Sequence, residues 1–113
     1  DAVVDAAPNA RVIVVGYPRL LPDDAGCRDR LPLAAGDLPL LREVNERLVD
    51  VLRAPALERD LDYLDLYEAS EGHDICSDDP WITGIETAPD GTIPFHPLAV
   101  EQESVATLIA EML

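Results

Sequence analysis

The sequence predicts an α/β fold, and three patterns indicate it. The run RVIVVG at 11–16 is rich in β-branched residues and precedes a proline, which is typical of a strand buried on both faces of a parallel sheet. An apolar repeat with helical spacing follows at 38–53. A second strand pattern at 61–67 and a second helical pattern from 97 onward repeat the order. Strands and helices in alternation indicate parallel strands joined by crossover helices.

A long loop is expected after the first strand. Residues 18–36 contain three prolines, two glycines and Cys27, and they show no hydrophobic period. Loops of this length are usually functional or tethered to the rest of the domain. Asp37 follows the loop and is a candidate N-cap for the next helix.

The helix predicted at 38–53 carries one apolar stripe. Pro55 is expected to end this helix, because proline lacks the amide hydrogen that an interior helical residue donates. The residues of the stripe that are predicted to face the core are Leu40, Leu41, Val44, Leu48, Val51 and Leu52.

The second strand is predicted at LDYLDLY, 61–67, where Leu64 and Leu66 share one face. Residues 68–95 show no regular pattern. Pro97 then suits the first position of a closing helix, where its missing amide hydrogen has no helical partner to lose. The stripe of this helix that is predicted to be buried consists of Val105, Leu108, Ile109 and Met112.

Length and charge limit the classes of function. The chain has 113 residues, enough for one small domain, and 23 Asp and Glu against 8 basic residues, all of them arginine. A net charge of −15 disfavours binding to nucleic acid, because the average surface repels a polyanion. No apolar run reaches the roughly 18 residues of a membrane-spanning helix, so we expect a soluble protein.

Two strands do not form a stable sheet by themselves. The apolar run at 11–16 needs neighbouring strands on both edges and helices on both faces, which is more than this chain supplies. We therefore expect residues 1–113 to be the C-terminal half of a larger α/β domain, with DAVVDAAPNA at 1–10 as the tail of a preceding helix. The first residue is Asp1 rather than Met, as expected of a processed product or a fragment.

Three segments resemble one family in their order and spacing. They are RVIVVGYPRLLP, GHDICSDDPW and PFHPLAVEQ, and they are similar to the C-terminal half of the secreted SGNH (GDSL-type) esterases and lipases of the actinobacterial kind. The resemblance covers nearly the whole chain and implies a flavodoxin-like three-layer α/β/α sandwich. It also implies hydrolysis of carboxylic esters by a serine nucleophile and a histidine base, an extracellular location and no cofactor.

The resemblance places the catalytic histidine at His96, which precedes Pro97 at the mouth of the last helix. Many members of the family have an aspartate three residues earlier to complete a triad, whereas this chain has Ile93. Some members use a Ser-His dyad in which a backbone carbonyl accepts the Nδ1 hydrogen bond, and the carbonyl of Ile93 is the matching candidate. The asparagine that the family has after HP is also replaced, by Leu98.

The family's serine and its oxyanion donors lie upstream of the matched region. The segment AGDLPL at 35–40 resembles the GDSL block only superficially, since Leu38 stands where the serine would be. Ser70, Ser77 and Ser104 are isolated and lie in no nucleophile-elbow context. We expect the chain alone to be inert and to need an N-terminal half that supplies the serine and the oxyanion donors. The substrate would be a small-molecule or lipid ester.

The segment GHDICSDDPW at 72–81 has the residue types of a metal cluster, a catalytic centre or a stapled loop. The resemblance implies that Cys76 pairs with Cys27 in a disulfide, and the two cysteines lack metal-ligand spacing. The alternative is a zinc or calcium site. Its ligands would be His73, Asp74, Asp78 and Asp79. Carboxylate runs are most often solvated surface, so we expect no metal, and Trp81 is predicted to pack over the loop or to line the acyl cleft.

Two functions stay open at this point. The first is the histidine-bearing part of a secreted serine esterase or lipase, in which the missing serine attacks the ester, His96 transfers the proton and the Ile93 carbonyl orients the ring. The second is a non-catalytic SGNH-like module or processed remnant used for binding. The changed residues at 93 and 98 would then reflect lost selection for catalysis.

Overall fold

The structure is a computed structural model that describes residues 2–24, 26–34 and 36–113. In chain order its elements are α1 (Ala2–Ala6), β1 (Ile13–Val15), α2 (Leu38–Glu58), β2 (Asp62–Leu64), α3 (Leu66–Ala69) and α4 (Ala99–Met112). Positions 25 and 35 belong to the predicted loop, and position 35 also opens the GDSL-like segment; both lie outside the described residues.

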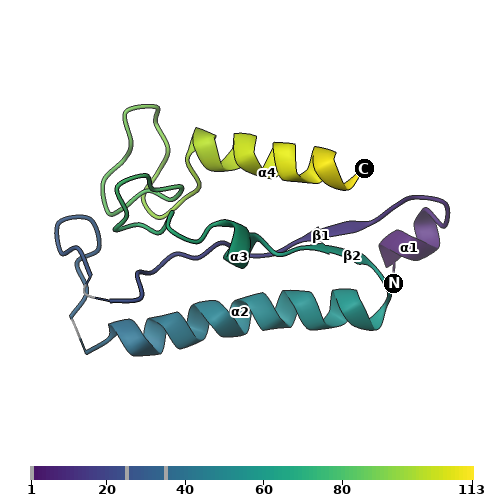
Figure 1. The fold of residues 1–113 in the computed structure, drawn as a ribbon, viewed down its shortest axis with the longest axis horizontal. Coiled ribbons are helices and arrows are strands. Elements are labelled where there is room, and N and C mark those ends of the chain that lie inside the picture. The colour runs from purple at the N-terminus through teal and green to yellow at the C-terminus, as the bar shows by residue number, and fades with distance from the viewer. Residues whose placement is uncertain (1, 25, 35) are drawn as a thin grey trace.

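The elements form three layers, with α2 and α4 on opposite sides of the strands (Figure 1). β1 and β2 pair in parallel, with Ile13 opposite Asp62 and Val15 opposite Leu64. Gly16 extends the ladder by donating its N–H to the Leu64 carbonyl at 2.9 Å. A parallel pair with helices on both sides confirms the predicted α/β class.

The second strand is shorter than the prediction of 61–67, because a polar cap ends it. Asp65 follows β2, and its carboxylate accepts the backbone N–H of Glu68 at 3.1 Å. This contact starts the short helix α3, so residues 65–67 are not strand as predicted. Leu64 and Leu66 are nevertheless both buried.

Helix α2 begins directly after Asp37, as predicted, but it runs through Pro55 to Glu58. The prediction that Pro55 ends the helix is therefore wrong. A proline removes one backbone hydrogen bond, and the turn beyond it is held by burial of Ala56, which is 2% exposed. The chain leaves the helix at Asp60, whose φ of 52° reverses its direction toward β2.

The apolar stripe predicted for α2 is not buried. Leu40 is 62% exposed and Val51 is 67% exposed, and Val44 and Leu48 are exposed as well. The buried side chains of the helix lie on a neighbouring face and are Leu38, Asn45, Val49 and Ala56. The described sheet is two strands wide, so the helix packs on it through a narrow face and the rest of its apolar surface is uncovered.

Helix α4 begins at Ala99, two residues later than predicted, because Pro97 and Leu98 are held in extended backbone. Pro97 pairs with Ile82 in an isolated antiparallel bridge, and Leu98 donates its N–H to the Trp81 carbonyl at 2.8 Å. The predicted inner stripe is half-buried, at Val105, Leu108, Ile109 and Met112. At the other end, Nη1 of Arg11 donates to the Met112 carbonyl and joins α4 to the segment before β1.

One cluster of buried hydrophobic side chains lies mainly among the loops. Its members within the described residues are Leu21, Leu31, Leu38, Ile75 and Ile82. The two cysteines pack against this cluster while partly exposed. Val49 and Ala56 of α2 and Leu64 of β2 are also buried. Within the ranges that the structure covers, no helix has the length and apolar character needed to cross a membrane.

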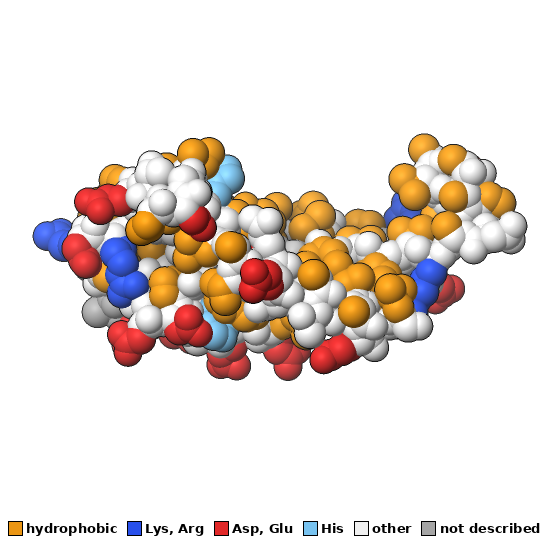
Figure 2. All heavy atoms as spheres, turned by 90° about the horizontal axis from the view of Figure 1, so that it is seen from above, with side chains coloured by type: hydrophobic (Ala, Val, Ile, Leu, Met, Phe, Trp, Pro, Cys, Tyr) orange, Lys and Arg blue, Asp and Glu red, His pale blue; other side chains and the backbone are white. Residues whose placement is uncertain are grey.

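Hydrophobic and acidic side chains lie on different parts of the surface. Seen from above, hydrophobic side chains gather over α4 and the strands beneath it (Figure 2). Acidic side chains lie at the loop end and along one rim (Figure 2).

Candidate active site

His96 lies on a turn, residues 93–96, that leads from the irregular segment toward α4, and its side chain is exposed. Phe95 in this turn has a φ of 61°, in the left-handed region that a bulky residue seldom adopts. Its N–H donates to the Gly84 carbonyl at 3.2 Å. Backbone conformations of this kind persist only where the surroundings impose them, and they concentrate at functional sites.

The turn brings a backbone carbonyl to the His96 ring. Nδ1 lies 2.8 Å from the carbonyl oxygen of Pro94. A carbonyl only accepts hydrogen bonds, so Nδ1 carries the hydrogen and the neutral ring has its lone pair on Nε2. No residue in the described ranges hydrogen bonds to Nε2, which is thus open to a further group.

The carbonyl that lies at Nδ1 of His96 is therefore that of Pro94, whereas the sequence analysis expected that of Ile93. The Ile93 carbonyl accepts the hydroxyl of Thr83 at 2.8 Å. The left-handed backbone at Phe95 explains the difference, since it folds the chain back so that the carbonyl two residues before His96, rather than three, meets the ring.

Thr83 is the residue that sequence reasoning missed. It is 5% exposed, and its hydroxyl accepts the backbone N–H of His96 at 3.0 Å while donating to the Ile93 carbonyl. Its own N–H donates to the His96 carbonyl at 3.0 Å. A lone threonine in a loop is too common a feature to mark this role in advance.

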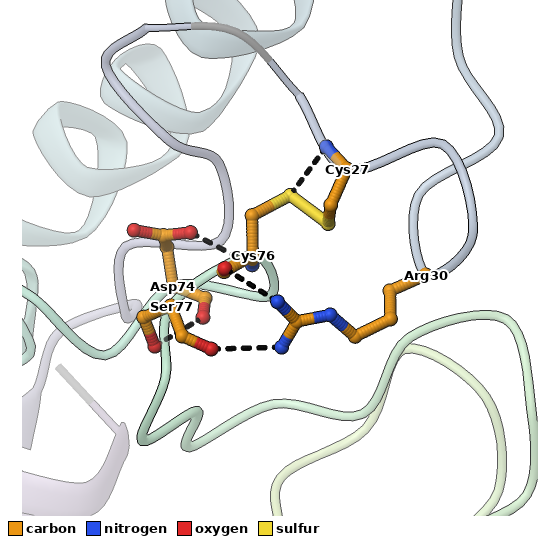
Figure 3. The surroundings of a disulfide bond; sticks show 5 residues. All are labelled: Cys27, Arg30, Asp74, Cys76 and Ser77. Carbon is orange, nitrogen blue, oxygen red and sulfur yellow. Dashed lines mark hydrogen bonds between the residues drawn. A yellow bond between two sulfur atoms is a disulfide. The ribbon is translucent and has the colours of Figure 1, made fainter.

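The segment around Thr83 is tied in turn to the disulfide loop. Ile85 donates its N–H to the carbonyl of Arg30 at 2.8 Å. The Arg30 guanidinium donates to the carbonyls of Cys76 and Ser77 at 2.6 Å and 2.7 Å, as Figure 3 shows. The His96 turn is thus connected through Thr83 and Arg30 to the loop that contains Cys76.

The disulfide that the resemblance implied, Cys27 to Cys76, is present, with a Cα–Cα distance of 5.4 Å (Figure 3). The N–H of Cys27 lies 3.0 Å from Sγ of Cys76. Asp74 supports the same loop, because its Oδ1 accepts the Cys76 N–H at 2.8 Å. GHDICSDDPW is therefore a stapled loop.

His73 belongs to a different set of contacts from His96. Its Nδ1 lies 2.8 Å from the Asp79 carbonyl oxygen and 3.4 Å from Oδ2 of the same residue. The ring stacks on Trp81, with centroids 4.4 Å apart and planes inclined by 15°. Trp81 is buried in this stack, so it packs over the loop, while a share in lining a cleft stays a prediction. Across the part of the chain that is described, no three His, Cys, Asp or Glu side chains are grouped to hold a metal ion.

The serines of the chain are engaged with nearby backbone. Ser70 is fully buried, accepts the N–H of Arg19 at 2.8 Å and donates to the Tyr67 carbonyl. Ser77 donates to the Asp74 carbonyl, and Ser104 donates to the Val100 carbonyl. Each contact is typical of a structural hydroxyl rather than of an activated nucleophile.

An apolar cavity of about 300 Å³ adjoins the turn. Phe95 contributes to its wall, next to His96 in the chain. The rest of the wall comes from the loop after β1, from the N-terminal half of α2 and from Ile75, with residues such as Leu20, Leu41 and Leu48. The cavity is thus of a kind that accepts hydrocarbon.

One buried carboxyl lies in the first turn of α4. Glu101 is 6% exposed, and burial raises the pKa of its carboxyl group above the ordinary value.

Comparison with known proteins gives this geometry a context. No protein-family model matches the chain. Over 111 residues it is 39% identical to Lipase 2 of Streptomyces coelicolor, a match that covers 95% of this chain and 37% of that protein. The chain is thus similar in sequence to part of a Streptomyces lipase. It spans about 37% of the length of Lipase 2.

The fold of this chain is also found in solved structures. Phospholipase A1 from Streptomyces albidoflavus superposes with a TM-score of 0.81 and 28% identity, over 96% of this chain and 46% of that one. The extracellular lipase of Streptomyces rimosus superposes with a TM-score of 0.77 and 25% identity, over 97% and 46%. These matches confirm the resemblance to SGNH hydrolases that the three sequence segments carried.

Proposed function

We propose that the chain is the histidine-bearing part of a carboxylic ester hydrolase, with His96 as its general base. The observation that carries the proposal is the orientation of the ring. Nδ1 faces the Pro94 carbonyl at 2.8 Å, and this leaves the lone pair of Nε2 directed away from that contact on an exposed side chain. A base held in one tautomer with a free nitrogen is the arrangement that a Ser-His dyad requires.

The reaction follows from that arrangement. Nε2 takes the proton of a serine hydroxyl as the oxygen attacks the ester carbonyl, and the tetrahedral intermediate collapses with loss of the alcohol, which receives the same proton. Water repeats the sequence on the acyl-enzyme and releases the acid. The Pro94 carbonyl holds the Nδ1 hydrogen throughout, but it stabilises the imidazolium less than a carboxylate would.

We propose that the serine and the oxyanion donors come from an N-terminal part outside these 113 residues. The serines of this chain are bound to nearby backbone carbonyls, and β1 is only half-buried, as expected of a strand with a neighbour on one edge only. The exposed apolar residues of α2 that lie outside the cavity, Leu40, Val51 and Leu57, support the same proposal, since they represent surface that a complete sandwich would cover. Residues 1–113 are then the C-terminal portion of one SGNH domain.

The substrate is proposed to be an ester with an apolar acyl group. The cavity beside Phe95 is lined almost wholly by hydrocarbon, and the names of the relatives, lipase and phospholipase A1, refer to lipid esters. An extracellular location fits the disulfide, because such bonds persist in oxidising compartments.

A hybrid hydrolase tests the proposal. Residues 1–113 replace the matching segment of S. coelicolor Lipase 2, and hydrolysis of a p-nitrophenyl ester is measured for the hybrid and for the chain alone. We expect turnover by the hybrid, rising from acid to neutral pH as a histidine base loses its proton, and none by the chain. A folded hybrid without turnover would favour the other function, a non-catalytic binding module with altered residues at 93 and 98.

A further inference from the structure

The turn that carries His96 is strained, and it is held by few contacts. Phe95 has a φ of 61°, which brings the Pro94 carbonyl back to Nδ1 of His96. A residue as bulky as phenylalanine relaxes to negative φ unless its neighbours prevent it. The geometry of the base therefore depends on whatever fixes the backbone from 93 to 96.

Five hydrogen-bond contacts with the segment 83–84 fix that backbone. Two are between main-chain groups, from Phe95 N–H to the Gly84 carbonyl and from Thr83 N–H to the His96 carbonyl, at 3.2 Å and 3.0 Å. The other three use the Thr83 hydroxyl. It accepts from the His96 N–H at 3.0 Å, and its one hydrogen faces the Ile93 carbonyl at 2.8 Å and, at the longer distance of 3.3 Å, the His96 carbonyl.

The hydroxyl thus closes the turn at both of its ends. A hydroxyl has one hydrogen and two lone pairs, so it satisfies the carbonyl and the amide at the same time. The main-chain bonds survive the loss of the hydroxyl, whereas the bonds that use it do not. Without the hydroxyl, the Ile93 carbonyl and the amide of His96 lose these partners.

We propose that Thr83 is a positioning residue for the general base, acting through the backbone of residues 93–96. The inference rests on the proposed function of His96. It assigns to Thr83 no contact with the substrate; its hydroxyl keeps the Pro94 carbonyl at Nδ1, and hence keeps Nε2 directed at the serine. An error of about 1 Å in the place of a catalytic group is enough to slow turnover by roughly 10²-fold.

The test compares Thr83→Val and Thr83→Ser in the hybrid hydrolase, with kcat expressed per folded molecule. Valine keeps the shape and removes the hydroxyl, so kcat should fall by about 10²-fold with KM nearly unchanged. Serine keeps the hydroxyl, so kcat should stay within about threefold of the parent. Thr107→Val is the matched control, because the Thr107 hydroxyl bonds only to the Glu103 carbonyl in its own helix.

Two outcomes would overturn the inference. One is Thr83→Val with the kcat of the parent. The other is a kcat of Thr83→Ser more than about tenfold below that of the parent, because this variant keeps the hydroxyl and lacks only the methyl group. That outcome overturns the inference even if Thr83→Val does not fold. His96→Ala separates the two hypotheses: if that variant keeps full turnover, the proposed function fails, whereas if it is inactive and Thr83→Val is not, only the role of Thr83 fails.

Discussion

Two parts of this molecule differ in how fully their side chains are packed. The loop end contains the disulfide between Cys27 and Cys76, and the sheet end contains β1 and β2. The loop end has a core of buried side chains, a disulfide and an arginine that binds two carbonyls of the facing loop. The sheet end has two short strands, of which β1 is only half-buried, and a helix with an uncovered apolar face. His96 belongs to the loop end.

The difference shows that two parts of the chain are stabilised in different ways. Irregular segments hold His96 in place through a disulfide, hydrogen bonds and a small core of their own. The strands, by contrast, gain burial only from neighbours, because a parallel sheet is stable when both faces and both edges are covered. We infer that the contacts around His96 are set within the chain, whereas the sheet depends on the proposed N-terminal part.

The largest effect is expected from removing the staple of the loop end. Replacing both Cys27 and Cys76 by serine should lower the free energy of unfolding of the hybrid by about 2–4 kcal/mol, since the unfolded chain gains conformational entropy when the disulfide is removed. Chemical denaturation measures this. Reductant should destabilise the parent to the same degree and leave the variant unchanged. Equal midpoints for oxidised and reduced parent would show that the loop end does not depend on its disulfide.

A smaller effect is expected at the contact between the two loop segments. A Cβ at Gly84 would lie 2.6 Å from the Arg30 carbonyl oxygen, so Gly84→Ala forces these backbones apart. Overpacking of this kind costs about 1–3 kcal/mol, and the shift should also reduce turnover through the neighbouring Phe95. Gly36→Ala is the control, because nothing lies within 4 Å of its added Cβ. Equal melting temperatures for the two variants would contradict the packing described.

A pH-dependent effect is expected at the entrance to α4. Burial raises the pKa of Glu101, so its neutral form is favoured in the folded state, and the stability it contributes is present at low pH and lost as pH rises through the raised value. Glu101→Gln should therefore stabilise the hybrid at neutral pH and have no effect in acid, as followed by thermal melting. Glu103→Gln, on the exposed side, is the control. A stabilisation independent of pH would exclude this origin.

The smallest effect belongs to the sheet end. The Arg11 side chain, which binds Oδ2 of Asp62 at 2.6 Å, lowers the pKa of that carboxyl group. Its stabilising contribution is present above the ordinary pKa of aspartate and is lost as pH falls through the lowered value. Asp62→Asn should therefore cost little at neutral pH, because the pair is exposed, and nothing in strong acid. Melting curves that diverge on acidification would contradict this sign.

The sequence patterns predicted the order of elements, the start of α2 after Asp37 and, through the resemblance, the disulfide. They failed where tertiary contacts override local preference. Pro55 does not end α2 because burial of the next residue holds the turn, and most of the predicted stripe of α2 is exposed because the described sheet is narrow.

For the candidate site, the motif PFHP indicated His96, whose catalytic role stays a proposal. The carbonyl that lies at its Nδ1 depends on one left-handed residue, Phe95, which composition does not reveal. The role proposed for Thr83 depends on a contact between residues thirteen positions apart in irregular segments, for which no periodic signal exists.

The most direct test of the whole account compares the two histidines of the hybrid hydrolase. His96→Ala should reduce ester turnover to the level of the chain alone while the melting temperature changes little, since the side chain is exposed. His73→Ala removes a ring that stacks on Trp81, so it should lower stability and leave kcat per folded molecule close to that of the parent. If His73→Ala abolishes turnover and His96→Ala retains it, then His96 is not the base and the account is wrong.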